Sequence, residues 1–231
     1  VLFITAVSVV SCVAFEYLIA RFLLKRQATI GDLSAVVTGV LLAFNLPAGI
    51  PWWIVVIGSL IAIGIGKMTY GGLGTNPFNP ALTGRIFLLM AYPVEMTDWT
   101  TSIPDALSGS TMLAEVKYNP ALASELNFTE MFGGYMNGSM GEISALALIL
   151  GGLYLLWRKV ITWHIPVAIL GTMAVFAAIY GAVSFDTPHL VSNFALFHLI
   201  AGGAVLGAVF MATDYVTSPM TPWGMVIYGI G

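Results

Sequence analysis

Few charged side chains lie inside the long apolar stretches of this sequence, and these are the first candidates for chemistry. Arg85 stands within one apolar run, Glu16 lies in another, and Asp214 follows a third. A charged side chain in hydrocarbon costs at least about 2.5–3.5 kcal/mol on insertion scales, so each should face the protein interior and have a partner. Arg85 therefore either stabilises a bound anion or forms a structural pair with carbonyl groups or with an acid on another helix.

Asp214 and Glu16 each allow two interpretations. Asp214 lies among threonine and serine hydroxyls, and such oxygens suit a hard cation such as Na⁺, which makes it a weak cation-site candidate. A cap for a membrane half-helix explains the same residues. Glu16 stands five positions before Arg21, so we expect it to snorkel or to pair locally, with a coupling-ion role as the alternative. No other metal site is predicted.

The glycine- and proline-rich run at residues 70–80 cannot be regular helix. It predicts a structured loop that leads into a helix, with Asn79 as the N-cap and Pro80 at the first helical position. Asn76 and Asn79 would then lie at a helix N-terminus, where backbone amides and the helix dipole favour an anion. Capping alone is the other explanation of these two asparagines.

Composition identifies the environment in which these residues must work. The chain has 231 residues, of which 58% are hydrophobic and 8% charged, and its mean hydropathy is +0.93. Soluble domains carry about 25% charged residues, so this chain has too little polar material to cover a globule in water. Disorder, nucleic-acid binding and an ordinary cytosolic enzyme are excluded, and the lone Cys12 cannot form an internal disulfide. The sequence predicts an integral membrane protein.

Apolar runs long enough to approach a membrane span recur along the whole chain. The predicted spans are 1–24, 34–47, 51–67, 78–94, 142–157, 161–183, 192–212 and a truncated 223–231. Several end on helix-breaking residues, and unpaired backbone in a membrane must line a cavity or be buried in protein. We therefore expect an all-α helix bundle with broken half-helices, forming one polytopic membrane domain over 1–231 that is incomplete at both ends.

Charges predict how the bundle is oriented. Counting each run as one crossing places six bases on one side, which the positive-inside rule makes the cytoplasm. These bases are Arg21, Lys25, Arg26, Lys67, Arg158 and Lys159. The long loop at 95–141 then lies outside the cell or in the periplasm, and it contains one base, Lys117.

A weak internal similarity links two of the breaks. Residues 41–45 with Pro51-Trp52 resemble 209–214 with Pro222-Trp223. In the crossing count these breaks lie on opposite sides of the membrane, as inverted repeats require. Chance similarity between apolar strings is the alternative.

The predicted outside loop contains a short segment whose hydroxyls and glycine suit a phosphoester. Residues 105–111 resemble the D-x-x-[ST]-G-A-T flavinylation motif, in which the final threonine is esterified by FMN. Glycine lets the backbone approach a phosphate closely, and flanking hydroxyls can bind its oxygens. The segment departs from the motif at Ser110, where alanine is expected, so either Ser110 or Thr111 could be modified.

Three further segments, 71–85, 96–99 and 212–222, occur in the same order around this motif as in a known family. Together they resemble the RnfD/NqrB family: the D subunit of the Rnf complex, an ion-translocating ferredoxin:NAD oxidoreductase, and the B subunit of sodium-pumping NADH:quinone oxidoreductase. The resemblance implies covalent FMN at Thr111, a urea-transporter-like fold and a second, noncovalent flavin (riboflavin). The cofactor-binding candidates are Thr111, Asp105, Ser108, Gly109, Ser110, Arg85, Asn76 and Asn79.

Two classes of function remain open at this point. The first is a subunit that relays electrons through FMN in a pump coupled to Na⁺ or H⁺, in a bacterial or archaeal cell membrane. The resemblance implies partners that include a second flavin subunit and iron–sulfur subunits, besides the lipid bilayer, and no nucleic acid. The second is a small-solute channel or transporter of urea-transporter-like fold, and a structural scaffold for a pump is a minor third. Fold likeness alone does not decide among them.

Overall fold

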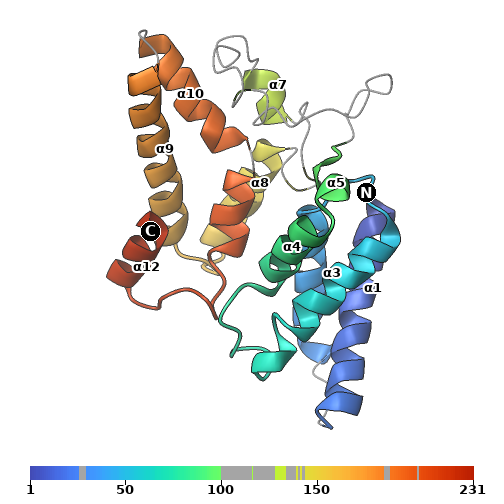
Figure 1. Cartoon of the computed structure of the whole chain (residues 1–231). Coiled ribbons are helices and arrows are strands. Elements are labelled where there is room, and N and C mark those ends of the chain that lie inside the picture. Colours follow the sequence, from blue (N-terminus) through green and yellow to red (C-terminus); the bar gives the residue numbers. More distant parts are fainter. Residues whose placement is uncertain are drawn as a thin grey trace. The chain divides into compact units, whose positions relative to one another are not determined.

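The computed structural model describes residues 1–25, 30–99, 116, 128–133, 139, 141, 144–184, 188–201 and 203–231. Every element in these ranges is helical (Figure 1), which confirms the all-α membrane class. The chain divides into two compact units, Val1–Trp99 and Thr100–Gly231. The FMN motif at 105–111 lies outside the described residues.

The described part of the first unit packs five α-helices and their connections. It contains α1 (Leu2–Leu18), which continues as a π-helical turn (Ile19–Leu23), then η2 (Ile30–Asp32), α2 (Ser34–Phe44), α3 (Trp52–Gly64), η3 (Met68–Tyr70), α4 (Pro80–Ala91) and α5 (Pro93–Thr97). Helix α1 packs against α2 and α3, and α3 packs against α4. Gly39 lets the backbones of α1 and α2 approach closely, because a Cβ at this position would lie 2.7 Å from the Cα of Val9 in α1.

The second unit is organised around one long helix. It contains α7 (Phe128–Gly133), α8 (Ala145–Trp157), α9 (His164–Ser184), α10 (Pro188–Ile200), α11 (Ala204–Leu206), η5 (Gly207–Met211) and α12 (Pro222–Ile230). Helix α9 packs against α10 and α12. Gly229 lets α12 approach α9, since its Cβ would lie 2.5 Å from the Ala168 side chain.

The helices agree with the predicted apolar runs, but one run contains a bend that was not predicted. The run 192–212 is not straight, because Val191–Ile200 and Ala204–Met211 meet at a bend of 58°. Gly203 at this bend has φ of 70°, a left-handed conformation that glycine adopts without steric penalty. The break after residue 212 was predicted from the sequence, but this bend was not.

Helix length limits the number of membrane crossings. In the described part of the chain, three helices are long and apolar enough to cross a membrane alone, namely Leu2–Leu23, Trp52–Tyr70 and His164–Ser184, and the bent pair makes a fourth candidate. The apolar helices Ser34–Phe44, Pro80–Ala91 and Ala145–Trp157 are shorter, and at 1.5 Å per residue they do not span a core of about 30 Å. Counting each run as a full crossing is therefore wrong for these three, and the side on which 95–141 lies stays a prediction.

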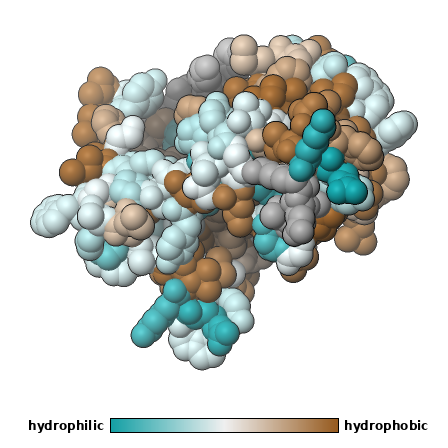
Figure 2. Space-filling model, turned by 90° about the horizontal axis from the view of Figure 1, so that it is seen from below, coloured by the Kyte–Doolittle hydropathy of each residue, from teal (hydrophilic) through white to brown (hydrophobic). Residues whose placement is uncertain are grey.

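The outer surfaces are apolar, as the membrane assignment requires. Helix α9 exposes six large hydrophobic side chains: Val167, Val175, Phe176, Ile179, Tyr180 and Val183. Figure 2 shows the molecule from below, where patches of strongly hydrophobic residues alternate with residues of intermediate hydropathy and the most hydrophilic ones form a few small groups. Lipid can solvate such surfaces, whereas water cannot.

Candidate functional site

A buried ion pair joins α1 to the end of α3. The Nζ atom of Lys67 lies 2.7 Å from Oε2 of Glu16, and the two side chains are 2% and 0% exposed. It is the only ion pair that the described ranges contain within 4 Å. The expected pairing of Glu16 with the nearby Arg21 is therefore wrong: its partner lies 51 residues further along the chain.

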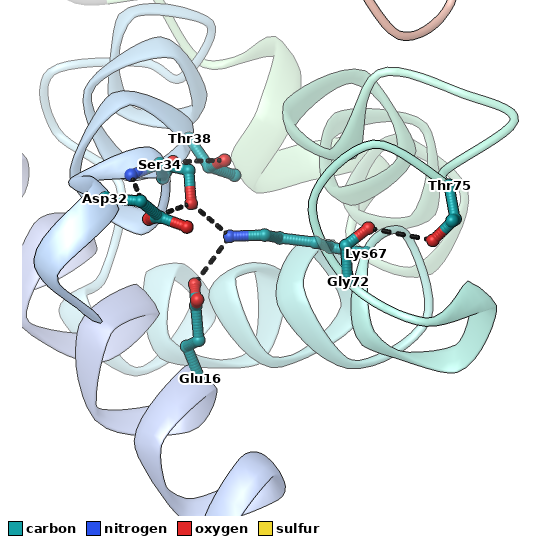
Figure 3. Close-up of polar contacts among 7 residues, drawn as sticks. All are labelled: Glu16, Asp32, Ser34, Thr38, Lys67, Gly72 and Thr75. Atoms are coloured by element: carbon teal, nitrogen blue, oxygen red, sulfur yellow. Dashed lines mark hydrogen bonds and ion pairs between the residues drawn. The ribbon is translucent and has the colours of Figure 1, made fainter. Parts of the chain in front are cut away.

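The same ammonium group reaches a second polar cluster at the start of α2. Lys67 Nζ donates to Ser34 Oγ at 2.5 Å, and that hydroxyl donates to Asp32 Oδ1 at 2.5 Å (Figure 3). The backbone N–H of Ser34 also donates to Asp32, at 2.9 Å. Partial burial alone would raise the pKa of Asp32, but the hydrogen bonds from Ser34 and the charge of Lys67 outweigh it and lower the pKa below its ordinary value.

The periodicity of α1 explains why Glu16 points inward. The buried residues of this helix are Ile4, Ser8, Cys12 and Glu16, at every fourth position, so they share one face. The Ser8 hydroxyl donates to the Gly39 carbonyl at 2.8 Å. The more polar face of α1 is thus turned inward and its apolar side chains outward, as in a membrane protein with a polar interior.

Glycines shape the chain that follows Lys67. Gly71, Gly72 and Gly74 have φ of 117°, 105° and 91°, conformations that other residues adopt with strain. The Gly72 N–H donates to the Lys67 carbonyl at 3.1 Å, and the Thr75 hydroxyl donates to the Gly72 carbonyl at 3.0 Å (Figure 3). These bonds hold the structured loop that the sequence predicted.

The loop ends in the predicted cap of α4. The Asn79 side-chain oxygen accepts from the backbone N–H groups of Ala81 and Leu82, at 3.0 and 3.4 Å, and Pro80 occupies the first helical turn. Asn76, which is also buried, donates to the Phe78 carbonyl at 3.0 Å. Both asparagines therefore serve the loop and the helix start, and anion binding there stays a prediction.

Arg85 has a neutral partner. Its Nη1 donates at 2.7 Å to the side-chain oxygen of Asn45, and the Asn45 amide donates in turn to the Leu41 carbonyl. Asn45 is buried at the break between α2 and α3, where the sequence predicted that a helix stops. The amide oxygen of Asn45 orients the guanidinium, which is compatible with either interpretation of Arg85.

Asp214 is engaged in a local turn. Its carboxylate oxygens lie 3.4 Å from the Val216 nitrogen and 3.5 Å from the Thr217 hydroxyl, and the Thr213 hydroxyl donates to the Val209 carbonyl instead. No group of three or more His, Cys, Asp or Glu side chains that could hold a metal ion occurs among the described residues. These contacts form a turn and not a helix cap, because η5 ends at Met211 and α12 begins at Pro222 with Thr221 as its cap, and a cation site at Asp214 stays a prediction.

Five predicted cofactor-binding residues, namely Asp105, Ser108, Gly109, Ser110 and Thr111, lie outside the described residues. Conversely, the Glu16–Lys67 pair was not predicted from the sequence, because Lys67 was interpreted as an interfacial base. A signal was available: a single acid in one apolar run and a single base at the end of another each require a partner.

Comparison with known proteins assigns the whole chain to one group. The model of the NQR2, RnfD, RnfE family matches residues 1–231. The D subunit of a Na⁺-translocating ferredoxin:NAD⁺ oxidoreductase complex from Acetobacterium woodii is 48% identical over 233 residues, covering 99% of this chain and 69% of that protein.

Two more relatives have a comparable sequence identity to this chain. The D subunit of a proton-translocating ferredoxin:NAD⁺ oxidoreductase complex from Clostridium ljungdahlii is 42% identical, covering 96% of this chain and 69% of its own length. The D subunit of an ion-translocating oxidoreductase complex from Stutzerimonas stutzeri is 40% identical, covering 99% of this chain and 71% of its own length.

Proposed function

This chain belongs to the NQR2, RnfD, RnfE family, and we propose that it is the flavin-carrying membrane subunit of an Rnf-type ferredoxin:NAD⁺ oxidoreductase complex. The observation that carries the proposal is the similarity of almost the whole chain to the D subunits of such complexes, at 40–48% identity. In this role the subunit relays electrons, and the complex couples their transfer to ion translocation. It is one part of an enzyme and not a catalyst alone.

The single cysteine supports a division of labour with partner subunits. Cys12 is buried in α1, and one thiol cannot hold an iron–sulfur cluster, which needs several cysteine ligands. We propose that electrons from ferredoxin reach this subunit through partner subunits and that NAD is reduced in another subunit. This chain contributes membrane helices and a flavin.

The chemistry of residues 105–111 supports covalent FMN. The Thr111 hydroxyl can form a phosphoester, and Gly109 gives the phosphate close access to the backbone. Asp105, Ser108 and Ser110 supply polar groups around it. When bound, FMN supplies a ring that accepts and passes on electrons. A phosphoester leaves that ring free, and a second, noncovalent flavin is a further part of the proposal.

Arg85 is the described residue best suited to stabilise negative charge in the first unit. Its guanidinium is oriented by an amide and carries a full positive charge. We propose that it stabilises a flavin anion. Arg85→Leu should then lower the reduction potential of a flavin in the assembled complex, and an unchanged potential would leave it a structural role only.

The central experiment tests Thr111 in protein produced together with a flavin transferase. Thr111→Val should abolish flavin fluorescence of the denatured subunit, because valine has no hydroxyl to esterify. Thr111→Ser should retain part of it, and Ser110→Ala, which restores the usual motif, should retain all of it. Peptide mass spectrometry of residues 95–117 locates the group. Unmodified Thr111 in wild-type protein, or FMN on Ser110, would contradict the proposal.

The quinone-reducing branch of the same family is the second candidate, since the family that matches includes NQR2. The assembled complex separates the two: ferredoxin-dependent NAD⁺ reduction supports the Rnf assignment, and NADH-dependent quinone reduction supports the alternative.

A further inference from the structure

A continuous chain of hydrogen bonds leads from the surface of the first unit to a fully buried carboxylate. Asp32 is exposed, Ser34 is half-buried, and Lys67 and Glu16 are buried. Figure 3 shows the four side chains converging, with the Lys67 ammonium between Glu16 on one side and Ser34 on the other. No gap separates consecutive polar groups along this path.

Each group on the path can take part in proton transfer. A serine hydroxyl both donates and accepts, and here Ser34 accepts from Lys67 while donating to Asp32. Lysine changes its protonation state readily when buried, unlike arginine. Glu16 at the inner end and Asp32 at the outer end are acceptors.

We propose that Glu16 is a proton-exchange site of the first unit, reached from the aqueous side through Asp32, Ser34 and Lys67. Lys67 gives a proton to Glu16, and the Ser34 hydroxyl then turns from Asp32 to the neutral Lys67 amine and gives it its proton. The Ser34 oxygen takes up the proton that has arrived on Asp32, and the hydroxyl turns back. The net change is one proton moved from water to the Glu16 carboxylate. Asp32, Ser34 and Lys67 end as they began, only O–H and N–H bonds change, and no electron moves.

A proton fits this site better than a metal ion. The position beside the Glu16 carboxylate is already filled by the Lys67 ammonium, at 2.7 Å. On the buried face of α1 the thiol of Cys12 lies one turn before Glu16, within hydrogen-bonding reach of Ser8 and Ser59, whereas Tyr17 is exposed. From the segment before α2, the facing group is Asp32 through Ser34. These groups offer proton acceptors and donors in hydrogen-bond contact with one another.

Protonation of Glu16 would also change the charge of the interior. The pair is neutral when Glu16 is ionised and carries one positive charge when Glu16 is protonated. A subunit that relays electrons through a membrane benefits from such a charge, because it offsets the electron. This consequence rests on the proposed function, whereas the proton site itself does not.

The first experiment asks whether Glu16 takes up a proton at all. Infrared difference spectra of the intact complex in liposomes, in sodium-free buffer, should show a protonated-carboxyl band as the pH is lowered. Glu16→Gln should remove that band, and Asp98→Asn, which changes an exposed carboxylate of the same unit, should leave it. A wild-type complex with no band assigned to Glu16 at any pH that it withstands would overturn the proposal.

The second experiment separates a proton path from a structural clamp. Lys67→Arg keeps the positive charge, but a guanidinium does not release its proton, so the ion pair can persist while transfer stops. After a pH jump, the Glu16 band should rise about tenfold more slowly or worse in this variant. A clamp alone predicts an unchanged rate.

The path through Ser34 is tested in the same way. Ser34→Ala should slow the rise of the band, and Ser34→Thr, which restores a hydroxyl, should recover it. Asp32→Asn should slow it too. Unchanged rates in Ser34→Ala and Asp32→Asn would overturn the proposed path. Flavin fluorescence of each variant is recorded in parallel, so a failure of the FMN assignment is recognised separately from a failure of the proton site.

Discussion

Two connections in this molecule lead into a helix in the same way but are fixed differently. Residues 65–79 join α3 to α4, and residues 212–221 join η5 to α12. Each ends in a Thr-x-Pro-x-x-Pro sequence, at 75–80 and at 217–222. In each, a polar side chain caps the helix and proline takes its first turn: Asn79 before Pro80, and Thr221 before Pro222.

The difference lies in what fixes each connection to its own unit. The first begins at Lys67, whose ammonium is buried against Glu16. The second begins near Asp214, a half-buried residue whose carboxylate contacts only its own turn, at 3.4 and 3.5 Å. The same local signal therefore starts both helices, but a long-range ion pair fixes only the first. This comparison predicts that the first connection is far more sensitive to substitution.

The largest expected effect is that of Lys67→Met. It leaves the Glu16 carboxylate buried without its ammonium partner, and breaking a buried pair in this way destabilises proteins by about 3–5 kcal/mol. The free energy of unfolding in detergent measures it. The matched change in the second connection, Asp214→Asn, removes only long contacts within a turn, so we expect about 1 kcal/mol or less.

The double variant Glu16→Gln with Lys67→Met sharpens this result. Removing both charges abolishes the buried unpaired carboxylate, so much of the lost stability should return. If Lys67→Met costs no more than Asp214→Asn, the two connections are equivalent and the comparison is wrong.

A smaller effect is expected from a glycine near the start of each connection, Gly66 in the first and Gly207 ahead of the second. A Cβ on Gly66 would lie 2.6 Å from the Ala62 carbonyl and 3.0 Å from the Cα of Pro80, and backbone atoms yield little. Gly66→Ala should therefore cost about 1–3 kcal/mol. Gly207 has nothing within 4 Å of its Cβ position, so Gly207→Ala should be neutral or stabilise by up to about 1 kcal/mol.

Thermal unfolding midpoints of these two alanine variants test the pair. Equal shifts would mean that the close approach of the end of α3 to the start of α4 does not constrain the first connection.

Replacing the helix cap should also cost more stability in the first connection than in the second, but the difference should be smaller. Asn79 is buried and accepts two backbone N–H groups, whereas Thr221 is exposed and accepts one, from Gly224 at 3.2 Å. Alanine at a cap costs about 0.5–2 kcal/mol. Asn79→Ala should fall near the upper end and Thr221→Ala near the lower end in the same unfolding assay. A larger loss for Thr221→Ala would reverse the ranking.

These contrasts show which features a sequence reveals. The caps Asn79 and Pro80 and the limits of the apolar helices were predictable, because they depend on neighbours a few residues away. The Asn45 break was also predictable, but its acceptance of a hydrogen bond from Arg85, 40 residues later, was not. Nor was the Glu16–Lys67 pair, because periodicity gives the face of a helix and not the helix that packs on it.

The bend at Gly203 was missed for a different reason. Residues 192–212 are predominantly apolar, and hydropathy does not distinguish a straight helix from two that meet at a glycine. A glycine inside an apolar run is compatible with both. Only the packing of α10 and η5 against α9 decides it.

The smallest expected effect concerns acid and the outer end of the ion-pair cluster. Hydrogen bonds from Ser34 outweigh partial burial and lower the pKa of Asp32, so folding favours its ionised form. The resulting stability is present above the unfolded-state pKa, about 3.9, and is lost as the pH falls through the lower folded-state value. Asp32→Asn should therefore flatten the acid side of the stability profile slightly, and solvent screening keeps the effect small. Unfolding midpoints measured for both proteins from neutral to acid pH test this. Identical profiles would mean that Asp32 contributes nothing to the stability of the ion-pair cluster, and that the first connection depends on Glu16 and Lys67.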